Sequence, residues 1–255
     1  MRAFTTDFEI MRADLCRIMY DATNSHAKYI FGTSVESFKE KDSFVEVRTR
    51  DGKTDRFDLL VGADGLGYRT RKLMLGSDAA NGFHRLGNEY IAYFTMRRPI
   101  REGKEYVATM YTAPGRRSLM TRRHSPHQIQ VYPACNIDSV RLKSARLGDI
   151  EEEKEAFAEI IRGAGWQTEE ILESLKDAND FYCERLGFVK LDSWSHGRVA
   201  LVGDAAYCPS ANTGMGTTSG ILGAYILAGE IGKHGGDLNR GDTDDGVATA
   251  LEAYE

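Results

Sequence analysis

The sequence predicts an α/β fold interrupted by a β-rich segment, and two observations support this. Two short, largely apolar runs, residues 59–63 and 198–202, lead directly to acidic residues, Asp64 and Asp204. Such a run is typical of a strand that is buried on both faces of a layered α/β structure. The segment between the two runs has mostly strand character. We therefore expect the chain to leave the α/β layer, form a second sheet and return.

The N-terminal part predicts one helix and a small group of strands. Residues 9–22 carry apolar side chains at helical spacing, which favours an amphipathic helix. Residues 29–58 change to short β-rich runs, and residues 50–53 have the composition of a hairpin turn. A short basic helix is expected at residues 68–75, directly after the first apolar run.

The middle and the end of the chain predict a sheet, two helices and a closing α/β piece. A helix over residues 214–231 is rich in small residues, which suits close packing, and a helical pattern resumes at 248–254. The remaining elements are expected as strands at 90–96, 106–112, 118–122 and 128–132, helices at 150–162 and 168–178, and a strand pair within 181–191.

Composition excludes several classes of function. The 255 residues carry a formal net charge of −5, so no strongly basic field predicts a nucleic-acid partner. The longest apolar stretch, residues 221–231, is short and interrupted, and the N-terminus has no apolar signal segment, so neither a membrane span nor export is expected. The scattered cysteines predict a reduced, cytoplasmic protein without disulfides or a metal site; they are Cys16, Cys135, Cys183 and Cys208.

Residues 197–216 carry the strongest indication of chemistry. A buried strand delivers Asp204 at its carboxyl end, where ligands of open α/β sheets bind. A loop containing Pro209 then leads to Gly214-Met215-Gly216, which open the long helix. Free N–H groups and the positive dipole end at a helix N-terminus favour negative charge. A carboxylate that can bind a sugar hydroxyl, facing such a terminus, suits a flavin. Asp204 would hold the ribityl chain, and the helix would stabilise charge near N1–C2 of the reduced ring.

Three segments resemble the class A flavoprotein monooxygenases of the para-hydroxybenzoate hydroxylase type, and within them the tetracycline-inactivating and polyketide hydroxylases. Residues 197–216 resemble the second FAD motif, residues 59–71 resemble the Asp-Gly motif, and residues 9–15 resemble the helix whose arginine reaches the flavin. The resemblance covers almost the whole chain. It implies FAD contacts at Arg12, Asp64, Gly65, Arg71, Gly203, Asp204, Pro209, Gly214, Met215 and Gly216.

The chain departs from the family pattern at three places. Tyr68 replaces the serine of the Asp-Gly motif, and Tyr207 replaces the usual histidine after Gly-Asp-Ala-Ala. No G-x-G-x-x-G follows a strand near the start, although that turn normally cradles the FAD pyrophosphate. We therefore expect either a fragment of a longer protein or a truncated product.

The resemblance implies part of a glutathione-reductase-like FAD-binding domain with an inserted antiparallel-sheet substrate domain. The expected division is residues 1–80 and 191–255 for the FAD-binding domain and 81–190 for the substrate domain. The implied reaction is hydroxylation of an aromatic or polyketide-like molecule with NADPH or NADH and O₂, through a flavin C4a-hydroperoxide. The cofactor does the difficult chemistry, so no catalytic acid, base or nucleophile is expected.

The substrate would lie between the inserted sheet and the flavin. Four side chains on the expected strands are candidates to line its site: Tyr90, Tyr93, Met110 and Tyr132. Because side chains alternate along a strand, about half of such candidates point away from any one face.

Several alternatives stay open or are weaker. A reductase or a halogenase would use the same flavin fold, although Trp166 and Trp194 do not form the Trp-x-Trp-x-Ile pattern of a halogenase. A non-enzymatic remnant that cannot hold FAD is the alternative from another class. Asp204 could be a strand-end cap, Asp64-Gly65 an ordinary turn and Arg12 a solvated helix residue. Four other short motifs are disfavoured by their sequence contexts. They are a metal site at His124 and His127, an adhesion tripeptide at 240–242, a calcium loop at 242–246 and a phosphate loop at 163–165.

Overall fold

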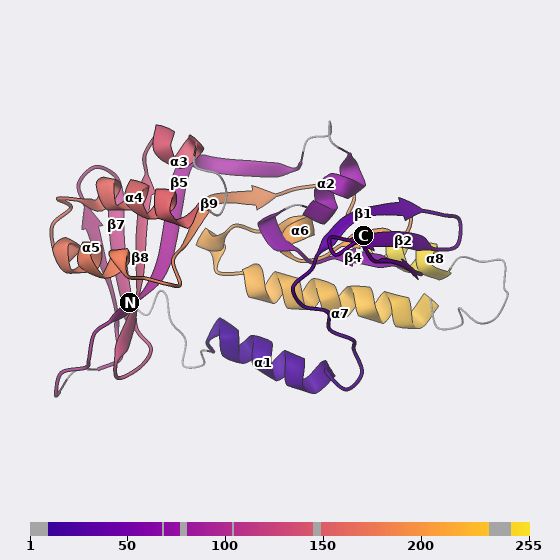
Figure 1. Cartoon of the computed structure of the whole chain (residues 1–255), viewed down its shortest axis with the longest axis horizontal. Helices are drawn as coiled ribbons and strands as arrows, with labels where there is room; N and C mark the ends of the chain where they lie inside the picture. Colours follow the sequence, from indigo (N-terminus) through magenta and orange to yellow (C-terminus); the bar gives the residue numbers. More distant parts are fainter. Residues whose placement is uncertain (1–9, 68, 77–80, 104, 145–148, 235–245) are drawn as a thin grey trace. The chain divides into compact units, whose positions relative to one another are not determined.

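The computed structural model describes residues 10–67, 69–76, 81–103, 105–144, 149–234 and 246–255 (Figure 1). The chain divides into two compact units, Met1–Asp58 and Leu59–Glu255, and each is described by itself. Within the described ranges, no helix is both long enough and apolar enough to span a bilayer.

The first unit contains a helix and a small antiparallel sheet. Helix α1 (Arg12–Thr23) confirms the helix predicted at 9–22, and strands β1 (Val35–Glu40), β2 (Val45–Thr49) and β3 (Thr54–Phe57) pair in sequence order. The hairpin between β2 and β3 turns where it was predicted, with Gly52 at a φ of 85°. Only glycine adopts that conformation readily.

In the second unit, a three-stranded sheet brings together the two apolar runs of the sequence. The order is β10 (Ser195–His196), β11 (Val199–Leu201) and β4 (Leu60–Gly62), and β11 pairs with β4 in parallel. All of β11 is fully buried, whereas Val61 in β4 is 38% exposed. The predicted burial on both faces is therefore confirmed for β11 and is wrong for β4.

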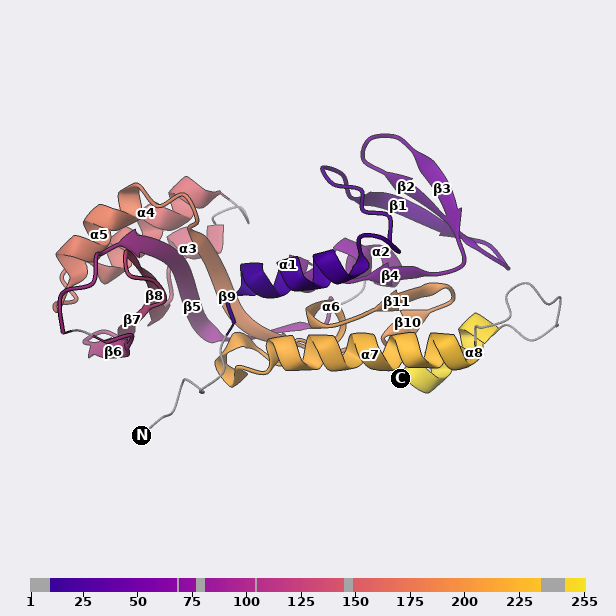
Figure 2. The same cartoon turned by 90° about the horizontal axis from the view of Figure 1, so that it is seen from below.

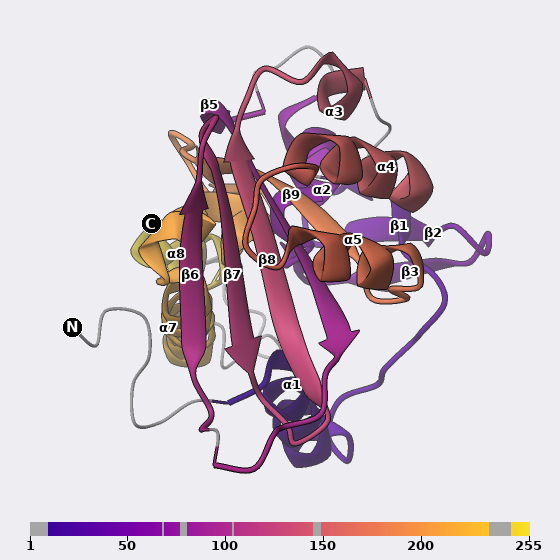
Figure 3. The same ribbon diagram turned by 90° about the vertical axis from the view of Figure 1, so that its left-hand side faces the viewer.

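The inserted segment forms its own five-stranded antiparallel sheet. Its order is β6 (Ala108–Ala113), β7 (Arg117–Arg123), β8 (Gln128–Asn136), β5 (Phe83–Arg97) and β9 (Tyr182–Val189). Helices α3 (Val140–Ser144), α4 (Ile150–Ile161) and α5 (Thr168–Lys176) cover one face of it (Figure 3). The strand pair expected within 181–191 is wrong. These residues form one strand, because their hydrogen-bonding partner is β5 and not a neighbouring segment of the chain.

Alternation along β5 decides which side chains enter the core of this domain. Tyr90, Ala92, Phe94 and Met96 are buried in the cluster that the sheet forms with its covering helices. The intervening residues lie on the opposite side, which we call the second face: the face of the five-stranded sheet turned away from α3, α4 and α5.

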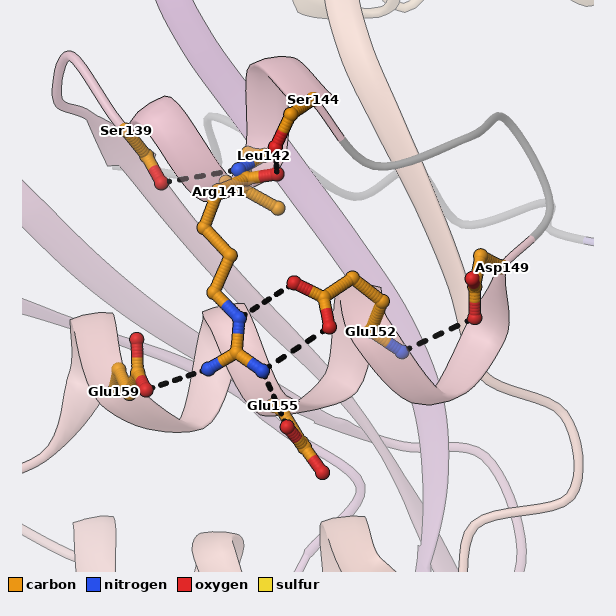
Figure 4. A network of polar contacts seen from close by, with 8 residues as sticks. All are labelled: Ser139, Arg141, Leu142, Ser144, Asp149, Glu152, Glu155 and Glu159. Carbon is orange, nitrogen blue, oxygen red and sulfur yellow. Dashed lines mark hydrogen bonds and ion pairs between the residues drawn. The ribbon is translucent and has the colours of Figure 1, made fainter.

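An arginine joins two of the covering helices. The Arg141 guanidinium of α3 binds Glu152 of α4 through two hydrogen bonds of 2.6 and 3.1 Å and also contacts Glu155 and Glu159 of α4 (Figure 4). The hydrogen bond from Arg141 lowers the pKa of the Glu152 carboxyl. Since Glu152, Glu155 and Glu159 share one side of α4, Arg141 also neutralises their mutual repulsion.

The described part of the second unit also contains the α-helices α2 (Arg69–Leu75), α6 (Asp204–Tyr207), α7 (Gly216–His234) and α8 (Gly246–Tyr254). Helix α7 contacts both α6 and α8 (Figure 2). Its small residues permit this: a Cβ added at Gly223 would lie 1.6 Å from the Tyr207 Oη. The Tyr207 hydroxyl lies 3.1 Å from that of Tyr254, which donates to the Leu201 carbonyl at 2.9 Å. The close packing expected of the small-residue helix is confirmed.

We predict that Arg141→Gln lowers the melting temperature at pH 7, because three glutamates on α4 lose their common cation. The folded-state pKa of Glu152 is depressed, so this stabilisation is present above its ordinary value of 4.5 and is lost as the pH falls through the folded-state value. Thermal melts at pH 7 and at about pH 3 should therefore show a difference from wild type that shrinks on acidification. Lys176→Gln, which breaks an exposed pair within α5, is the control and should have a smaller effect.

We predict that Gly223→Ala destabilises the protein by about 1–3 kcal/mol, because the methyl group would overlap the Tyr207 ring. Gly229→Ala in the same helix is the matched control. Nothing lies within 4 Å of a Cβ at that position, so alanine should stabilise α7 by about 0.5–1 kcal/mol. Urea unfolding of both variants measures the two effects. Equal free energies of unfolding would show that Tyr207 moves aside without cost.

Candidate cofactor-binding site

The parallel pairing of β4 with β11 places two acidic turns at one edge of the sheet. Val199 pairs with Leu60 and Leu201 with Gly62, and the N–H of Val202 donates to the Gly62 carbonyl at 3.0 Å. The chain continues into Asp64 after β4 and into Asp204 after β11. The carboxyl ends of both strands therefore meet, as the fold class requires for a ligand site.

Asp204 begins α6 and faces the start of α7. Its Oδ1 atom is buried and has no hydrogen-bond partner among the residues that the structure describes. A Cβ built on Gly216 would lie 3.8 Å from that oxygen. The predicted approach of Asp204 to the N-terminus of the long helix is confirmed. A buried carboxylate oxygen without a donor is costly, so a ligand hydroxyl donated to it would fit here.

Glycines hold the Asp204 turn against α7. Gly203 has a φ of 65°, and a Cβ added to it would lie 3.5 Å from the Cα of Gly220. The two backbones therefore approach without intervening side chains. The position of Asp204 relative to α7 is set by backbone contact, which leaves little room for adjustment.

Residues 208–216, which we call the 208–216 loop, join α6 to α7 through a tightly bonded turn. The Thr213 hydroxyl donates to the Ser210 carbonyl at 2.8 Å and accepts from the N–H of Met215 at 3.1 Å. Gly214 is left-handed, with a φ of 67°, and Met215 is half exposed. Pro209 precedes the turn. This bonding fixes where α7 begins and so where its N–H groups point.

Cys208 lies at the start of this loop but is not poised for reaction. Burial raises the pKa of its thiol to about 11, and the charge of the Asp204 carboxylate and a side-chain hydrogen bond to it act in the same direction. A cysteine that stays protonated at neutral pH is neither a good nucleophile nor a metal ligand. Across the described part of the chain, no three His, Cys, Asp or Glu side chains gather closely enough to hold a metal ion.

Asp64 supports the neighbouring helix. Its Oδ2 accepts the N–H of Thr70 in the first turn of α2 at 2.8 Å. Gly65 follows with a φ of 67° and opens a single 3-10 turn, η1 (Gly65–Gly67). This hydrogen bond supports the alternative reading of Asp64 as a structural turn residue. A flavin contact by Asp64 or Gly65 stays a prediction.

Arg71 links α2 to the Asp204 turn. The side chain is fully buried, and its NH1 donates to the Ala205 carbonyl at 2.7 Å. Sequence reasoning selected Arg71 but missed this partner, because 134 residues separate the two along the chain. A direct contact between Arg71 and FAD stays a prediction. The hydrogen bond to the Ala205 carbonyl makes Arg71 a support for the turn that carries Asp204.

Arg12 is the first residue of α1 and belongs to the first compact unit. Its proposed contact with the flavin stays a prediction. Tyr68 and residues 240–245, which include the adhesion tripeptide and most of the calcium-loop candidate, lie outside the described residues.

The candidates for the substrate site divide between the two faces of the five-stranded sheet. Tyr90 is 3% exposed and belongs to the core beneath the helices, so its selection was wrong. Tyr93 and Tyr132 lie on the second face with ring centroids 5.4 Å apart, and Tyr93 also stacks on Tyr182 at 5.6 Å. Tyr182 was missed, and only the pairing of β9 with β5 reveals it.

Five of these side chains form one row across the sheet. Met110 pairs with Met120 and Met120 with Tyr132, next to Tyr93 and its partner Tyr182. We call these five residues the Met/Tyr row. All five strands contribute one member, so the row offers a continuous apolar and aromatic surface on the second face.

Comparison with known proteins identifies the relatives of the chain. A sequence profile described as an FAD binding domain matches residues 9–236. The chain is 48% identical to the FAD-dependent monooxygenase asL4 of Sarocladium schorii, over all of this chain and 61% of that protein. It is 37% identical to the flavin-dependent monooxygenase eupH of a Phoma species, over 98% of this chain and 60% of the relative. The chain thus spans about three fifths of the length of these relatives.

Solved structures also resemble this chain along nearly its whole length. The crystal structure of tetracycline destructase Tet(51) aligns with a TM-score of 0.80 and 32% identity, covering 96% of this chain and 61% of that one. Tetracycline destructase Tet(55) aligns with a TM-score of 0.75 and 27% identity, covering 95% and 60% of the two chains.

We predict that Asp64→Ala lowers the free energy of unfolding by about 0.5–2 kcal/mol, because the N–H of Thr70 loses its acceptor. Asp64→Asn should cost less, since its amide oxygen can accept the same hydrogen bond. Denaturant titration compares the two variants. If both variants lose the same stability, the carboxylate charge matters and not the hydrogen bond.

Proposed function

This chain belongs to the class A FAD-dependent monooxygenases, a family of flavin-dependent oxidoreductases, and we propose that it forms the flavin-facing and substrate-binding part of a hydroxylase for an aromatic or polyketide-like molecule. One observation carries the proposal: the Asp204 Oδ1 is buried without a described partner and faces the N-terminus of α7. The proposed setting is a glutathione-reductase-like FAD-binding domain with the five-stranded sheet as its insert.

Each described group has a role in holding the flavin. Asp204 accepts a hydrogen bond from a ribityl hydroxyl, which satisfies its buried oxygen. The N-terminus of α7 stabilises negative charge on the pyrimidine side of the ring. Gly214 and Gly216 leave room for the ring to approach the backbone. Arg71 holds the Asp204 turn in place through Ala205. Bound FAD, reduced by NADPH or NADH, supplies the activation of O₂.

The Met/Tyr row supports a planar, polycyclic substrate. Aromatic rings gain stabilisation from offset or edge contacts beyond the burial of their area. Methionine side chains adapt to irregular apolar shapes, which suits a ligand with substituents around its rings. Two similar structures are tetracycline destructases, which favours a multi-ring molecule for this chain as well. The role of the protein is then to orient the electron-rich carbon and to exclude water.

We predict that Asp204→Ala weakens FAD binding by roughly ten- to a hundredfold. The substitution removes a charge-assisted hydrogen bond worth about 1.5–3 kcal/mol, and 1.4 kcal/mol corresponds to a factor of ten. The measurement is a fluorescence-quenching titration with FAD, using the longest natural form of the protein that contains these 255 residues. Asp192→Ala removes an exposed carboxylate from the loop before β10 and should leave the affinity unchanged.

A thermal melt of the FAD-free protein accompanies the titration. Asp204 faces α7 and not the apolar core, so the variant should melt close to the wild-type temperature. Unchanged FAD affinity with a sharply lowered melting temperature would identify Asp204 as a strand-end cap and refute the proposed site.

A further inference from the structure

A single carboxylate bridges the five-stranded sheet and the 208–216 loop. The Glu89 Oε1 accepts a hydrogen bond from the Asn136 amide of β8 at 3.2 Å, and its Oε2 accepts one from the Asn212 amide at 3.0 Å. Asn136 is the cross-strand partner of Glu89, whereas Asn212 belongs to the turn η2 (Ala211–Thr213) within the loop. Each oxygen of Glu89 therefore has one partner, and the two partners come from different parts of the fold.

The backbone around Glu89 is irregular in a way that directs this side chain. The pairing of β5 with β9 shifts register between Arg85 and Tyr90, and Gly87 in that interval has a φ of 58°. A bulge re-aims side chains and often adjoins a functional site. A second tie between the sheet and the loop lies nearby, where the N–H of Val189 donates to the Cys208 carbonyl at 3.0 Å. The backbone bond anchors the start of the loop, and Glu89 anchors its middle.

Glu89 also lies on the same face as the aromatic side chains. Residues 89, 91 and 93 of β5 alternate with the buried residues of the core and so share the second face. Tyr93 lies four positions after Glu89, which corresponds to about 13 Å along the strand. The loop is thus attached at one end of the surface that carries the Met/Tyr row.

We propose that Glu89 is a positioning residue whose carboxylate latches the 208–216 loop to the second face and so fixes the separation between the flavin and the Met/Tyr row. This inference rests on the proposed function. Transfer of an oxygen atom needs reacting atoms at about 3–3.5 Å, and a displacement of about 1 Å can cost a hundredfold in rate. The loop sets the flavin side of that distance and the sheet sets the substrate side. Glu89 bonds to both.

The first arm of the test needs no ligand. Hydrogen–deuterium exchange of the protein should show amides of residues 208–216 exchanging severalfold faster in Glu89→Ala, the effect of losing one solvent-exposed hydrogen bond to a charged group. Glu89→Gln, which keeps one carbonyl acceptor, should lie between wild type and Glu89→Ala. The matched control is Glu170→Gln, which loses a carboxylate bonded to Arg98 on the far side of the same domain. It should leave the exchange of the loop unchanged.

The second arm uses FAD as the probe in the longest natural form of the protein. Tyrosine quenches flavin emission by electron transfer that falls steeply with distance, so the fluorescence lifetime of bound FAD reports the separation from the tyrosines of the Met/Tyr row, Tyr93, Tyr132 and Tyr182. At saturating FAD, Glu89→Ala should lengthen the lifetime, and Glu89→Gln should restore it in part. In a Tyr93→Phe/Tyr132→Phe/Tyr182→Phe background, the same Glu89→Ala change should have no effect on the lifetime.

Three results would overturn the proposal. Unchanged exchange in the loop refutes the proposal that Glu89 holds the 208–216 loop against the second face. Faster exchange with an unchanged lifetime shows that Glu89 ties down the loop without setting the flavin-to-sheet distance, which refutes the positioning role alone. Failure of the wild type to bind FAD refutes the proposed function and the positioning role together, while the exchange data still decide whether the latch exists.

Discussion

Strands β4 and β11 are each only three residues long, yet their parallel pairing determines where the Asp64 and Asp204 turns lie. It brings the turn that starts at Asp64 beside the turn that starts at Asp204. Asp64 then fixes the first turn of α2 through Thr70, and α2 carries Arg71 into contact with Ala205. Each step depends on the one before, so a loss of the strand pairing would remove both the acidic edge and its supports.

The second constraint is the distance between α7 and the Asp204 turn. Helices usually contact through side chains, but here Gly203 meets Gly220 by backbone, and Gly223 receives the Tyr207 ring. This packing lets the N-terminus of α7 come close to the Asp204 carboxylate. The five-stranded sheet joins the same assembly through the 208–216 loop, by a backbone hydrogen bond to Cys208 and the Glu89 bridge. The Asp204 turn and the Met/Tyr row are thereby held in one compact unit.

The sequence predicted the features that local pattern determines. Apolar runs, acidic strand ends and a small-residue helix are all contiguous, and each was placed correctly. The predictions that failed concern contacts between segments that are distant in the sequence. Which face Tyr90 occupies follows from how the sheet packs under its helices, and a run of β-formers cannot reveal that β9 pairs with β5. The Glu89 bridge was not predicted because Asn212 lies 123 residues away and neither residue belongs to a motif.

The contact between Tyr207 and Gly223 has a consequence for how this lineage can change over time. With tyrosine at position 207, any side chain larger than a hydrogen atom at 223 meets the ring, so the two positions are not free to vary independently. A smaller residue at 207 would remove the overlap, so alanine or serine at 223 costs less when the change at 207 comes first. The hydroxyl pair with Tyr254 adds a third member to this dependence. The order of substitutions at these sites is therefore constrained by their shared volume, and reversal becomes difficult once position 223 has filled.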